Sequence, residues 1–257
     1  KNGKENLFKA RNLYQLILNQ PNLEKYYKGR IYGDIWRIDK IIKLEKDIEY
    51  FSQYGQDKFI YENFFPNKKN GFFLEIGAYD GLSGSNCAFF EKYLNWKGLL
   101  IEPSPIYSKK IKKNRSMPLV TTALGSIEGK KKFLSIEEGY TQMSGLLDNI
   151  SIDQMRLIRS NDKHKENIIE VPVTSLSNLL KKFNLNKIDY CSLDTEGSEE
   201  EILSVFNFKD FYIDVFSIEN NNKKKYIKNI MEKNNYELLN IIGYDEIWKK
   251  LSKEKNI

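Results

Sequence analysis

Acids and glycines recur at the ends of short apolar runs, and these residues have the types and spacing to do chemistry. The run Gly71-Phe-Phe-Leu-Glu75-Ile-Gly77-Ala-Tyr-Asp80-Gly81 places three apolar residues before an acid, and glycines follow at 77, 81 and 84. This pattern predicts a buried strand that ends in a tight turn, where the backbone approaches a ligand closely. We therefore expect a nucleotide-type small molecule to bind at this turn.

Further acids follow later apolar runs. Glu102 ends the run 98–102, Asp194 and Glu196 follow 188–193, and Glu219 follows 213–218. Open parallel sheets bind ligands beyond the carboxyl ends of their strands, so these acids should gather at one edge. A carboxylate at Glu102 can accept the hydroxyl hydrogens of a ribose.

The first turn lacks the usual phosphate-binding signatures. Its glycine spacing is not Gly-x-Gly-x-x-Gly, and it has no Gly-Lys-Ser/Thr loop. Glu75 and Asp80 would repel a pyrophosphate. They favour a cationic ligand, such as the sulfonium and ammonium groups of S-adenosylmethionine.

The elements that must position these residues alternate between strand and helix from residue 51 onward. Near-continuous apolar strands between amphipathic segments predict an α/β fold with a parallel sheet covered on both faces. Residues 246–249, after the Gly243 turn, suggest a final antiparallel edge strand. An irregular insertion at 126–173 should contain the strand pair 131–136 and 167–173 and a helix near 151–160. The predicted strands are 72–76, 98–102, 118–123, 188–193, 213–218 and 236–242, and the predicted helices are 85–95, 105–114, 174–183, 198–205 and 222–234.

We expect residues 1–50 to form a separate part of the chain. Their apolar residues recur with helical spacing, so we expect an N-terminal helical extension, followed by one domain over residues 51–257. The extension could serve as a surface for homo-oligomers or another partner, or as a lid on the sheet. Because the first residue is Lys, we expect that the natural chain continues upstream.

Composition excludes several function classes. No stretch approaches the ~18 apolar residues of a membrane span, and no secretory signal opens the chain. Two cysteines, Cys87 and Cys191, cannot build a disulfide framework or a zinc site, which favours a reducing cytoplasm. The net charge of +6 comes from lysine clusters without interleaved aromatic residues, so nucleic acid is not an expected partner. The single histidine, His164, lies in a polar stretch typical of a solvated loop.

The motifs together, in this order, resemble the FkbM family of S-adenosylmethionine-dependent methyltransferases. The resemblance covers about residues 50–245 and leaves residues 1–50 outside. The residues that carry it are Ser52-Gln-Tyr-Gly-Gln56-Asp57, Phe73-Leu-Glu-Ile-Gly-Ala-Tyr-Asp80-Gly81, Gly84-Ser-Asn86, Gly98-Leu-Leu-Ile-Glu-Pro103, Ser144-Gly145-Leu146 and Asp189-Tyr-Cys-Ser-Leu-Asp-Thr-Glu-Gly-Ser-Glu199.

The resemblance implies a class I methyltransferase fold, in which a Rossmann-like seven-stranded sheet ends in an antiparallel strand. It also implies the cofactor contacts. Glu102 would hold the ribose, Pro103 and Ser104 would flank the adenine, and Ala123 and Leu124 would lie on its other side. Gln56 and Asp57 would reach the methionine end. The first loop would contribute Glu75, Gly77, Ala78, Tyr79, Asp80 and Gly81, with Asn86 nearby; Tyr79 replaces the Asn that is common in this loop.

Three readings of the acids after the fourth and fifth strands stay open. Asp194, Glu219 and Asn220 offer hard oxygen ligands for Mg²⁺ or Mn²⁺, at positions where catechol-type O-methyltransferases hold a metal. Alternatively, Asp194 or Glu196 acts as a metal-free catalytic base. In the third reading Glu196, Ser198 and Glu199 merely cap the next helix.

The resemblance implies an O-methyltransferase acting on a sugar hydroxyl, in a glycan or a small-molecule glycan precursor. Tyr140, Tyr244 and Trp248 could stack on a sugar ring, or simply pack in the protein. The alternatives are a protein or nucleic-acid methyltransferase and a non-catalytic interaction module. Asp194-Thr-Glu-Gly replaces the Asn/Asp-Pro-Pro-aromatic motif of nucleic-acid amino methyltransferases, which argues against that chemistry.

Overall fold

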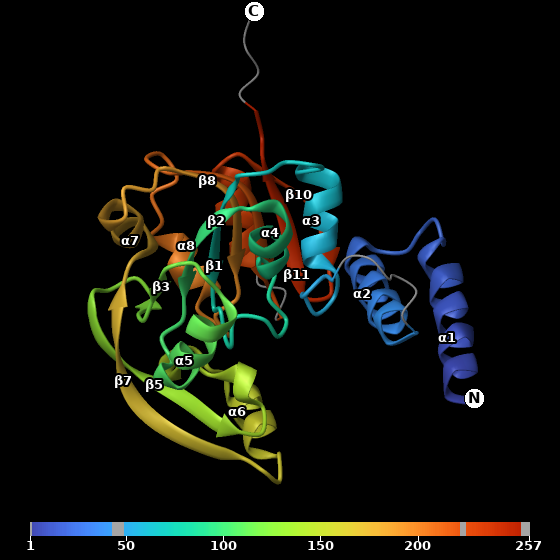
Figure 1. The fold of residues 1–257 in the computed structure, drawn as a ribbon, viewed down its shortest axis with the longest axis horizontal. Helices are drawn as coiled ribbons and strands as arrows, with labels where there is room; N and C mark the ends of the chain where they lie inside the picture. The colour runs from blue at the N-terminus through green and yellow to red at the C-terminus, as the bar shows by residue number, and fades with distance from the viewer. Residues whose placement is uncertain (1, 43–48, 222–224, 253–257) are drawn as a thin grey trace, which may run out of the picture.

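A seven-stranded sheet with helices on both faces forms the centre of the molecule (Figure 1). The computed structural model describes residues 2–42, 49–221 and 225–252. The strand order is β10-β11-β9-β8-β1-β2-β3, and every pair is parallel except those that β11 makes with β9 and β10. The strands are β1 (Phe72–Ile76), β2 (Lys97–Ile101), β3 (Leu119–Val120), β8 (Lys187–Leu193), β9 (Tyr212–Glu219), β10 (Tyr236–Ile242) and β11 (Asp245–Lys250).

Alternation along β1 divides the core into two layers. Leu74 and Ile76 belong to a cluster that includes residues of α7, α8 and α9, whereas Phe73 belongs to a cluster with residues of α3, α4 and α5. Successive side chains of a strand point to opposite faces, so both faces of the sheet are buried, as predicted. The helices are α3 (Gln56–Phe64), α4 (Ala88–Leu94), α5 (Pro105–Asn114), α7 (Leu176–Lys182), α8 (Glu199–Ser204) and α9 (Lys225–Lys233).

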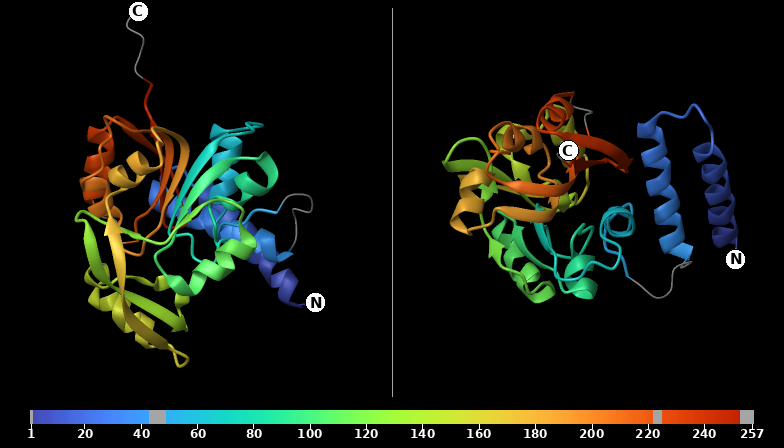
Figure 2. Two further views of the ribbon diagram at one scale, coloured as in Figure 1. Left: turned by 60° about the vertical axis from the view of Figure 1, so that its left-hand side comes forward. Right: turned by 90° about the horizontal axis from the view of Figure 1, so that it is seen from above.

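A second, four-stranded sheet, ordered β4-β7-β5-β6, is built by the segment 123–174 beside the main one (Figure 2). The predicted strand pair forms its centre, because β5 and β7 run antiparallel from Gly129↔Val173 to Glu138↔Lys165. The predicted helix is α6 (Ile152–Arg159), which begins with a capping box at Ser151. The strands are β4 (Ala123–Leu124), β5 (Gly129–Glu138), β6 (Gly145–Leu146) and β7 (Lys165–Thr174).

Two strand predictions were wrong in detail. The predicted strand 118–123 is divided, because β3 pairs with β2 while Ala123 already pairs with β7. Between them the Thr122 hydroxyl donates to the Pro172 carbonyl at 2.8 Å, which leads the chain from one sheet to the other. The predicted edge strand 246–249 is instead interior: β11 lies between β9 and β10, and its Ile247 and Trp248 are fully buried.

Two N-terminal helices, α1 (Asn2–Leu18) and α2 (Lys25–Ile42), lie at one side of the molecule, with α2 between α1 and the rest of the chain (Figure 1). Helix α2 packs directly on β10, because a Cβ at Gly29 would lie 1.8 Å from the Ile241 carbonyl oxygen. Arg11 of α1 forms an ion pair with Asp39 of α2. Helices were predicted here, and residues 43–48 of that prediction lie outside the described residues, as do residues 222–224 of the predicted helix 222–234.

Helix α3 was not predicted, because its nine residues mix polar and aromatic side chains without a clear stripe. Its start is set by Gly55, which has a left-handed φ of 84°. Among the described residues, no helix is both long and apolar enough to cross a membrane.

Candidate active site

A cavity of about 670 Å³ opens beyond the carboxyl ends of β1, β2, β8 and β9. The loops that follow these strands line one side of it, and residues between 140 and 157 line another. Thirteen of the predicted site residues line this cavity: Gln56, Glu75, Gly77, Ala78, Tyr79, Asn86, Glu102, Pro103, Ala123, Leu124, Asp194, Glu196 and Glu219. Five others are not among the lining residues: Asp57, Asp80, Gly81, Ser104 and Asn220.

The turn after β1 is tight because another loop crosses it. Gly77 has a φ of 89°, and a Cβ there would lie 1.7 Å from the Asp194 carbonyl oxygen. The backbone N–H groups of Gly77 and Ala78 both donate to the Ile101 carbonyl, at 2.9 and 3.1 Å. The glycine is therefore required by the contact between the loops after β1 and β8, and this contact brings the expected cofactor loop beside the acids.

Asp80 and Gly81 make hydrogen bonds that stabilise the loop, and they do not line the cavity. The Asp80 carboxylate accepts hydrogen bonds from the backbone N–H groups of Leu82 and Ser83, at 2.9 and 2.7 Å. These hydrogen bonds to the charged form outweigh partial burial and lower the pKa of Asp80. The Gly81 carbonyl accepts from Arg115. The prediction that both residues contact the cofactor is not supported by their positions.

Glu75 lines the cavity, but its charge is already compensated. One carboxylate oxygen accepts from the Arg115 guanidinium at 2.6 Å, and the other accepts from the Ser85 hydroxyl at 2.5 Å. We inferred a cationic ligand from Glu75 and Asp80, yet both acids are satisfied by the protein. The other acids that line the cavity have no Lys or Arg partner among the described residues.

Glu102 lies at the end of β2, 6% exposed, and organises its surroundings. Its two oxygens accept from the backbone N–H groups of Ser104 and Tyr79, at 2.8 and 2.9 Å. Burial raises the pKa of Glu102 to about 7. Pro103, Ala123 and Leu124 line the cavity, whereas Ser104 is completely buried at the start of α5 and is not among the lining residues.

Asp57 anchors a turn and does not contact the cavity. Its carboxylate accepts from the backbone N–H groups of Phe51, Ser52 and Lys58 and from the Ser52 hydroxyl. The adjacent Gln56 does line the cavity. Of the two residues predicted to reach the cofactor, Asp57 therefore has a structural role and Gln56 lies at the site.

Asp245, at the start of β11, was missed. It is fully buried, lines the cavity, and accepts hydrogen bonds from the side chains of Gln56 and Asn86. Burial, followed by the nearby Asp194 charge, raises the pKa of Asp245 to about 8, although these two hydrogen bonds lower it. A signal existed, since Asp245 follows the predicted strand 236–242 as the other acids follow theirs.

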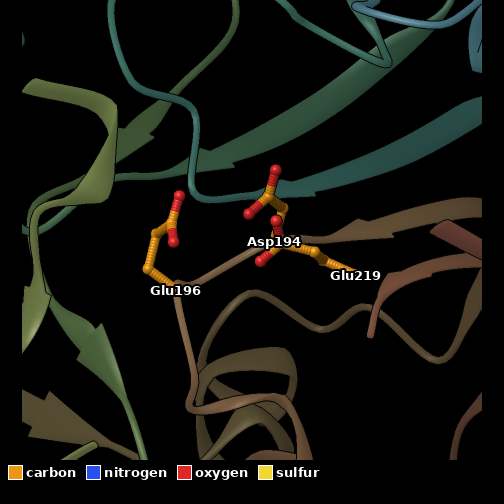
Figure 3. A group of neighbouring side chains, drawn as sticks. All are labelled: Asp194, Glu196 and Glu219. Carbon is orange, nitrogen blue, oxygen red and sulfur yellow. The ribbon is translucent and has the colours of Figure 1, made fainter. Parts of the chain in front are cut away.

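Three carboxylates meet at the ends of β8 and β9: Asp194, Glu196 and Glu219 (Figure 3). One oxygen from each lies within 4.8 Å of the others. Burial raises the pKa of Asp194 to about 7, and burial with the charge of Asp194 raises the pKa values of Glu196 and Glu219 well above their usual range. Each of the three carboxyl groups is therefore harder to deprotonate than an exposed one.

Asn220 does not join this cluster. Its side-chain amide donates to Glu246 at 3.0 Å, and its backbone N–H donates to the Tyr244 carbonyl. Glu196 takes the place that we predicted for Asn220, because its left-handed φ of 58° turns the chain at this point.

Glu199 performs the structural role that the capping alternative assigned to three residues. Its carboxylate accepts from the backbone N–H groups of Thr195 and Gly197 and from the Thr195 hydroxyl. Ser198 makes no side-chain cap, and its hydroxyl accepts from Asn149. Glu199 thus closes the loop, and Asp194 and Glu196 remain on the cavity side.

The second sheet and its connections complete the cavity. The Tyr79 hydroxyl and the Thr141 hydroxyl are 2.7 Å apart, so the expected cofactor loop touches the segment 140–146. Tyr140 and Tyr244 line the cavity, as an aromatic sugar platform requires, but Trp248 is fully buried in the core. Trp248 therefore packs in the protein, which is the second of the two alternatives for these aromatic residues.

A family model described as "Methyltransferase FkbM domain" matches residues 75–246. The chain belongs to the FkbM methyltransferase family. The match spans the loop after β1, the whole acid cluster and β11 as far as Glu246.

Solved structures of methyltransferases match this chain at low sequence identity. An FkbM methyltransferase from Methylobacillus flagellatus KT is 9% identical, with 95% of this chain and 59% of that chain covered and a TM-score of 0.44. A precorrin-6y C5,15-methyltransferase from Geobacter metallireducens GS-15 is 10% identical, with 82% and 95% covered and a TM-score of 0.43. This FkbM chain thus spans about three fifths of the length of the first structure. A search of curated proteins found no match.

Proposed function

We propose that this protein is an O-methyltransferase that methylates a sugar hydroxyl in a glycan or a glycan precursor. Family membership supports methyl transfer. The carboxylate cluster of Asp194, Glu196 and Glu219 is the observation that leads us to propose a hydroxyl as the methyl acceptor. A hydroxyl is a weak nucleophile until it loses its proton. A carboxylate with a pKa near 7, as at Asp194, is suited to accept that proton.

The cavity residues fit S-adenosylmethionine. Each oxygen of Glu102 accepts one backbone N–H, and a carboxylate has about four acceptor positions, so ribose hydroxyls can still bind. Pro103, Ala123 and Leu124 would flank the adenine. Asp245, with Gln56 and Asn86, would face the ammonium of the methionine part, and the bound cofactor would supply an electrophilic methyl group.

Asp194 or Glu196 would then act as the base. Both line the cavity, and Glu219 beside them would stabilise the proton that the base receives. Tyr140 and Tyr244 would offer ring faces to the acceptor. The chain's part in the reaction is to align the acceptor, exclude water and take up one proton.

A divalent ion is the alternative occupant of the cluster. Mg²⁺ or Mn²⁺ on Asp194, Glu196 and Glu219 would relieve the repulsion of three neighbouring acids and lower the pKa of a bound hydroxyl. EDTA treatment followed by dialysis decides between the two routes. Full activity afterwards rules out the metal, and activity that is lost and then restored by Mg²⁺ or Mn²⁺ supports it.

The decisive test combines cofactor binding with a labelled-methyl assay. We expect calorimetry to detect S-adenosylmethionine binding, and we expect Glu102→Gln to weaken it about tenfold or more, as for hydrogen bonds to a charged group. The exposed acid variant Glu170→Gln is the matched control and should bind as wild type does. Labelled S-adenosylmethionine and a panel of cell glycans should then give a base-stable methyl ether. Absence of binding at about 1 mM cofactor would contradict the enzymatic proposal.

Other acceptors are outcomes of the same assay. Label on protein or nucleic acid instead of glycan would favour the alternative methyltransferase, and cofactor binding without transfer to any acceptor would favour an interaction module. Asp194-Thr-Glu-Gly at the end of β8 supports the hydroxyl over a nucleic-acid amino group.

We further propose that residues 1–50 form a helical extension of a domain over residues 51–257, and that the extension pairs two copies of the chain. Phe8, Leu13 and Leu16 of α1 are exposed, which supports an apolar contact there. Light scattering of wild type and of Leu13→Asp would measure the state of association. The free, buried Cys87 and Cys191 are consistent with the cytoplasmic location that we propose.

A further inference from the structure

Arg115 lies beneath the loop that follows β1, although it ends a lysine-rich stretch of sequence. Its side chain is 0% exposed, and Nη1 donates to Glu75 at 2.6 Å, to the Gly81 carbonyl at 3.0 Å and to the Ser85 hydroxyl at 3.2 Å. Its Nε donates to Glu91 of α4. One guanidinium therefore connects β1, the middle and the end of the loop 77–85, and a neighbouring helix.

The end of α5 holds this loop through two consecutive carbonyl groups. Asn114 donates to the Asp80 carbonyl at 2.9 Å, and Arg115 donates to the next carbonyl, that of Gly81. The fit is close, since a Cβ at Gly81 would lie 2.9 Å from Cγ of Arg115. Asp80 and Gly81 are not among the residues that line the cavity, whereas Gly77, Tyr79 and Ser85 line it.

The charges make Arg115 hard to replace. Burial alone would lower its pKa, but the carboxylates of Glu75 and Glu91 raise the pKa of Arg115 overall. Buried ion pairs often add little stability compared with apolar residues of the same volume. The network around Arg115 is therefore better explained by the loop geometry that it fixes than by a gain in stability.

We propose that Arg115 is a positioning residue that holds the loop 77–85 in its cofactor-binding conformation and so sets the affinity for the cofactor without touching it. This inference rests on the proposed binding of S-adenosylmethionine in the cavity. Arg115 is not among the residues that line the cavity, so its effect must pass through Glu75, Gly81 and Ser85.

Arg115→Lys tests the inference with the charge retained. A lysine ammonium is a compact point charge and cannot span Glu75, Glu91 and the Gly81 carbonyl together. S-adenosylhomocysteine is the probe for calorimetry, because its neutral sulfur removes the sulfonium charge from the measurement. We expect a Kd at least tenfold weaker for the folded variant, and faster hydrogen exchange of the amides 77–85. Arg156→Lys, on an arginine that is 77% exposed, should change neither.

A merely structural role gives a different result. Arg115→Lys would then unfold at a lower temperature, yet below that temperature it would bind S-adenosylhomocysteine within twofold of wild type, which would overturn the inference. If Arg115→Lys does not fold, Asn114→Ala decides, because it removes only the bond to the Asp80 carbonyl. We expect a Kd at least threefold weaker for Asn114→Ala, and an unchanged Kd would again overturn the inference. Failure of wild type itself to bind would contradict the proposed function instead.

Discussion

At the scale of single residues, the acids at the strand ends differ in what compensates their charge. Glu75 is paired with Arg115 and Asp80 with backbone N–H groups, whereas the half-buried Asp194 and the buried Asp245 have other acids nearby. Because parallel strands end together, the sequence places Glu75, Asp80 and Asp194 at one edge of the sheet. Asp245, which begins the antiparallel strand β11, was missed. The sequence does not reveal that Arg115 compensates the charge of Glu75, because Arg115 lies in a lysine-rich stretch and nothing there marks it as buried.

The raised pKa of Asp194 predicts the pH dependence of methyl transfer. When the pH is below the pKa of Asp194, about 7, its carboxylate is protonated and cannot take the proton of the sugar hydroxyl. The rate should therefore rise between about pH 6 and pH 8. Asp194→Asn should lose about 10²-fold or more in rate and should show no such rise. Initial rates across pH at saturating cofactor measure both effects. A wild-type rate that falls over this range would contradict Asp194 as the base.

At the scale of elements, hydrophobic pattern predicted where strands lie better than which strands they pair with. Runs such as 72–76 and 188–193 matched β1 and β8 closely, because their burial follows from their composition. The pattern of 246–249 is the same for an edge and for an interior strand, so the place of β11 could not be predicted. The division of 118–123 follows from pairing that the pattern does not show, because Ala123 pairs with β7 and Thr122 bonds to Pro172.

The crossing of the loops after β1 and β8 gives a prediction for Gly77→Ala. A left-handed φ alone costs a non-glycine residue about 1–3 kcal/mol, and the contact with the Asp194 carbonyl oxygen adds to this. Gly129→Ala is the control, because Gly129 has a φ of 140° but no atom within 4 Å of its Cβ position. We expect denaturant unfolding to show a larger loss of stability for Gly77→Ala. Equal losses would show that the crossing of the loops does not require glycine.

At the scale of the whole molecule, the charge is unevenly distributed. The sequence carries a net charge of +6, but the described residues that line the cavity include six acids and no Lys, Arg or His. Three parts of the chain build this acidic cavity: the main sheet, the second sheet and, through Arg30 packed 4.1 Å from the centroid of the Tyr244 ring, helix α2. The sequence could not predict this convergence, because the insertion 126–173 shows no regular alternation.

Buried acids with raised pKa values predict that the ligand-free protein loses stability as pH rises. Glu102, Asp194 and Asp245 hold protons in the folded state up to pH values of about 7, 7 and 8, whereas unfolded carboxyls release them near pH 4. The free energy of unfolding should therefore fall by at least ~1.4 kcal/mol between about pH 5 and pH 7, which corresponds to one unit of one pKa. Urea titrations at several pH values measure it. A free energy that stays constant or rises over this range would contradict the raised pKa values.

The interior position of β11 has a consequence for synthesis of the chain. Residues 245–250 lie between β9 and β10, so the sheet cannot close on the ribosome until residue 250 has left the exit tunnel. Gly29 of helix α2 is synthesised more than 200 residues before Ile241 of β10. Helix α2 can therefore pack on β10 only after β10 has been synthesised. The protein should therefore acquire its fold late and all at once, and ribosome-bound chains that stop before β11 should remain sensitive to protease.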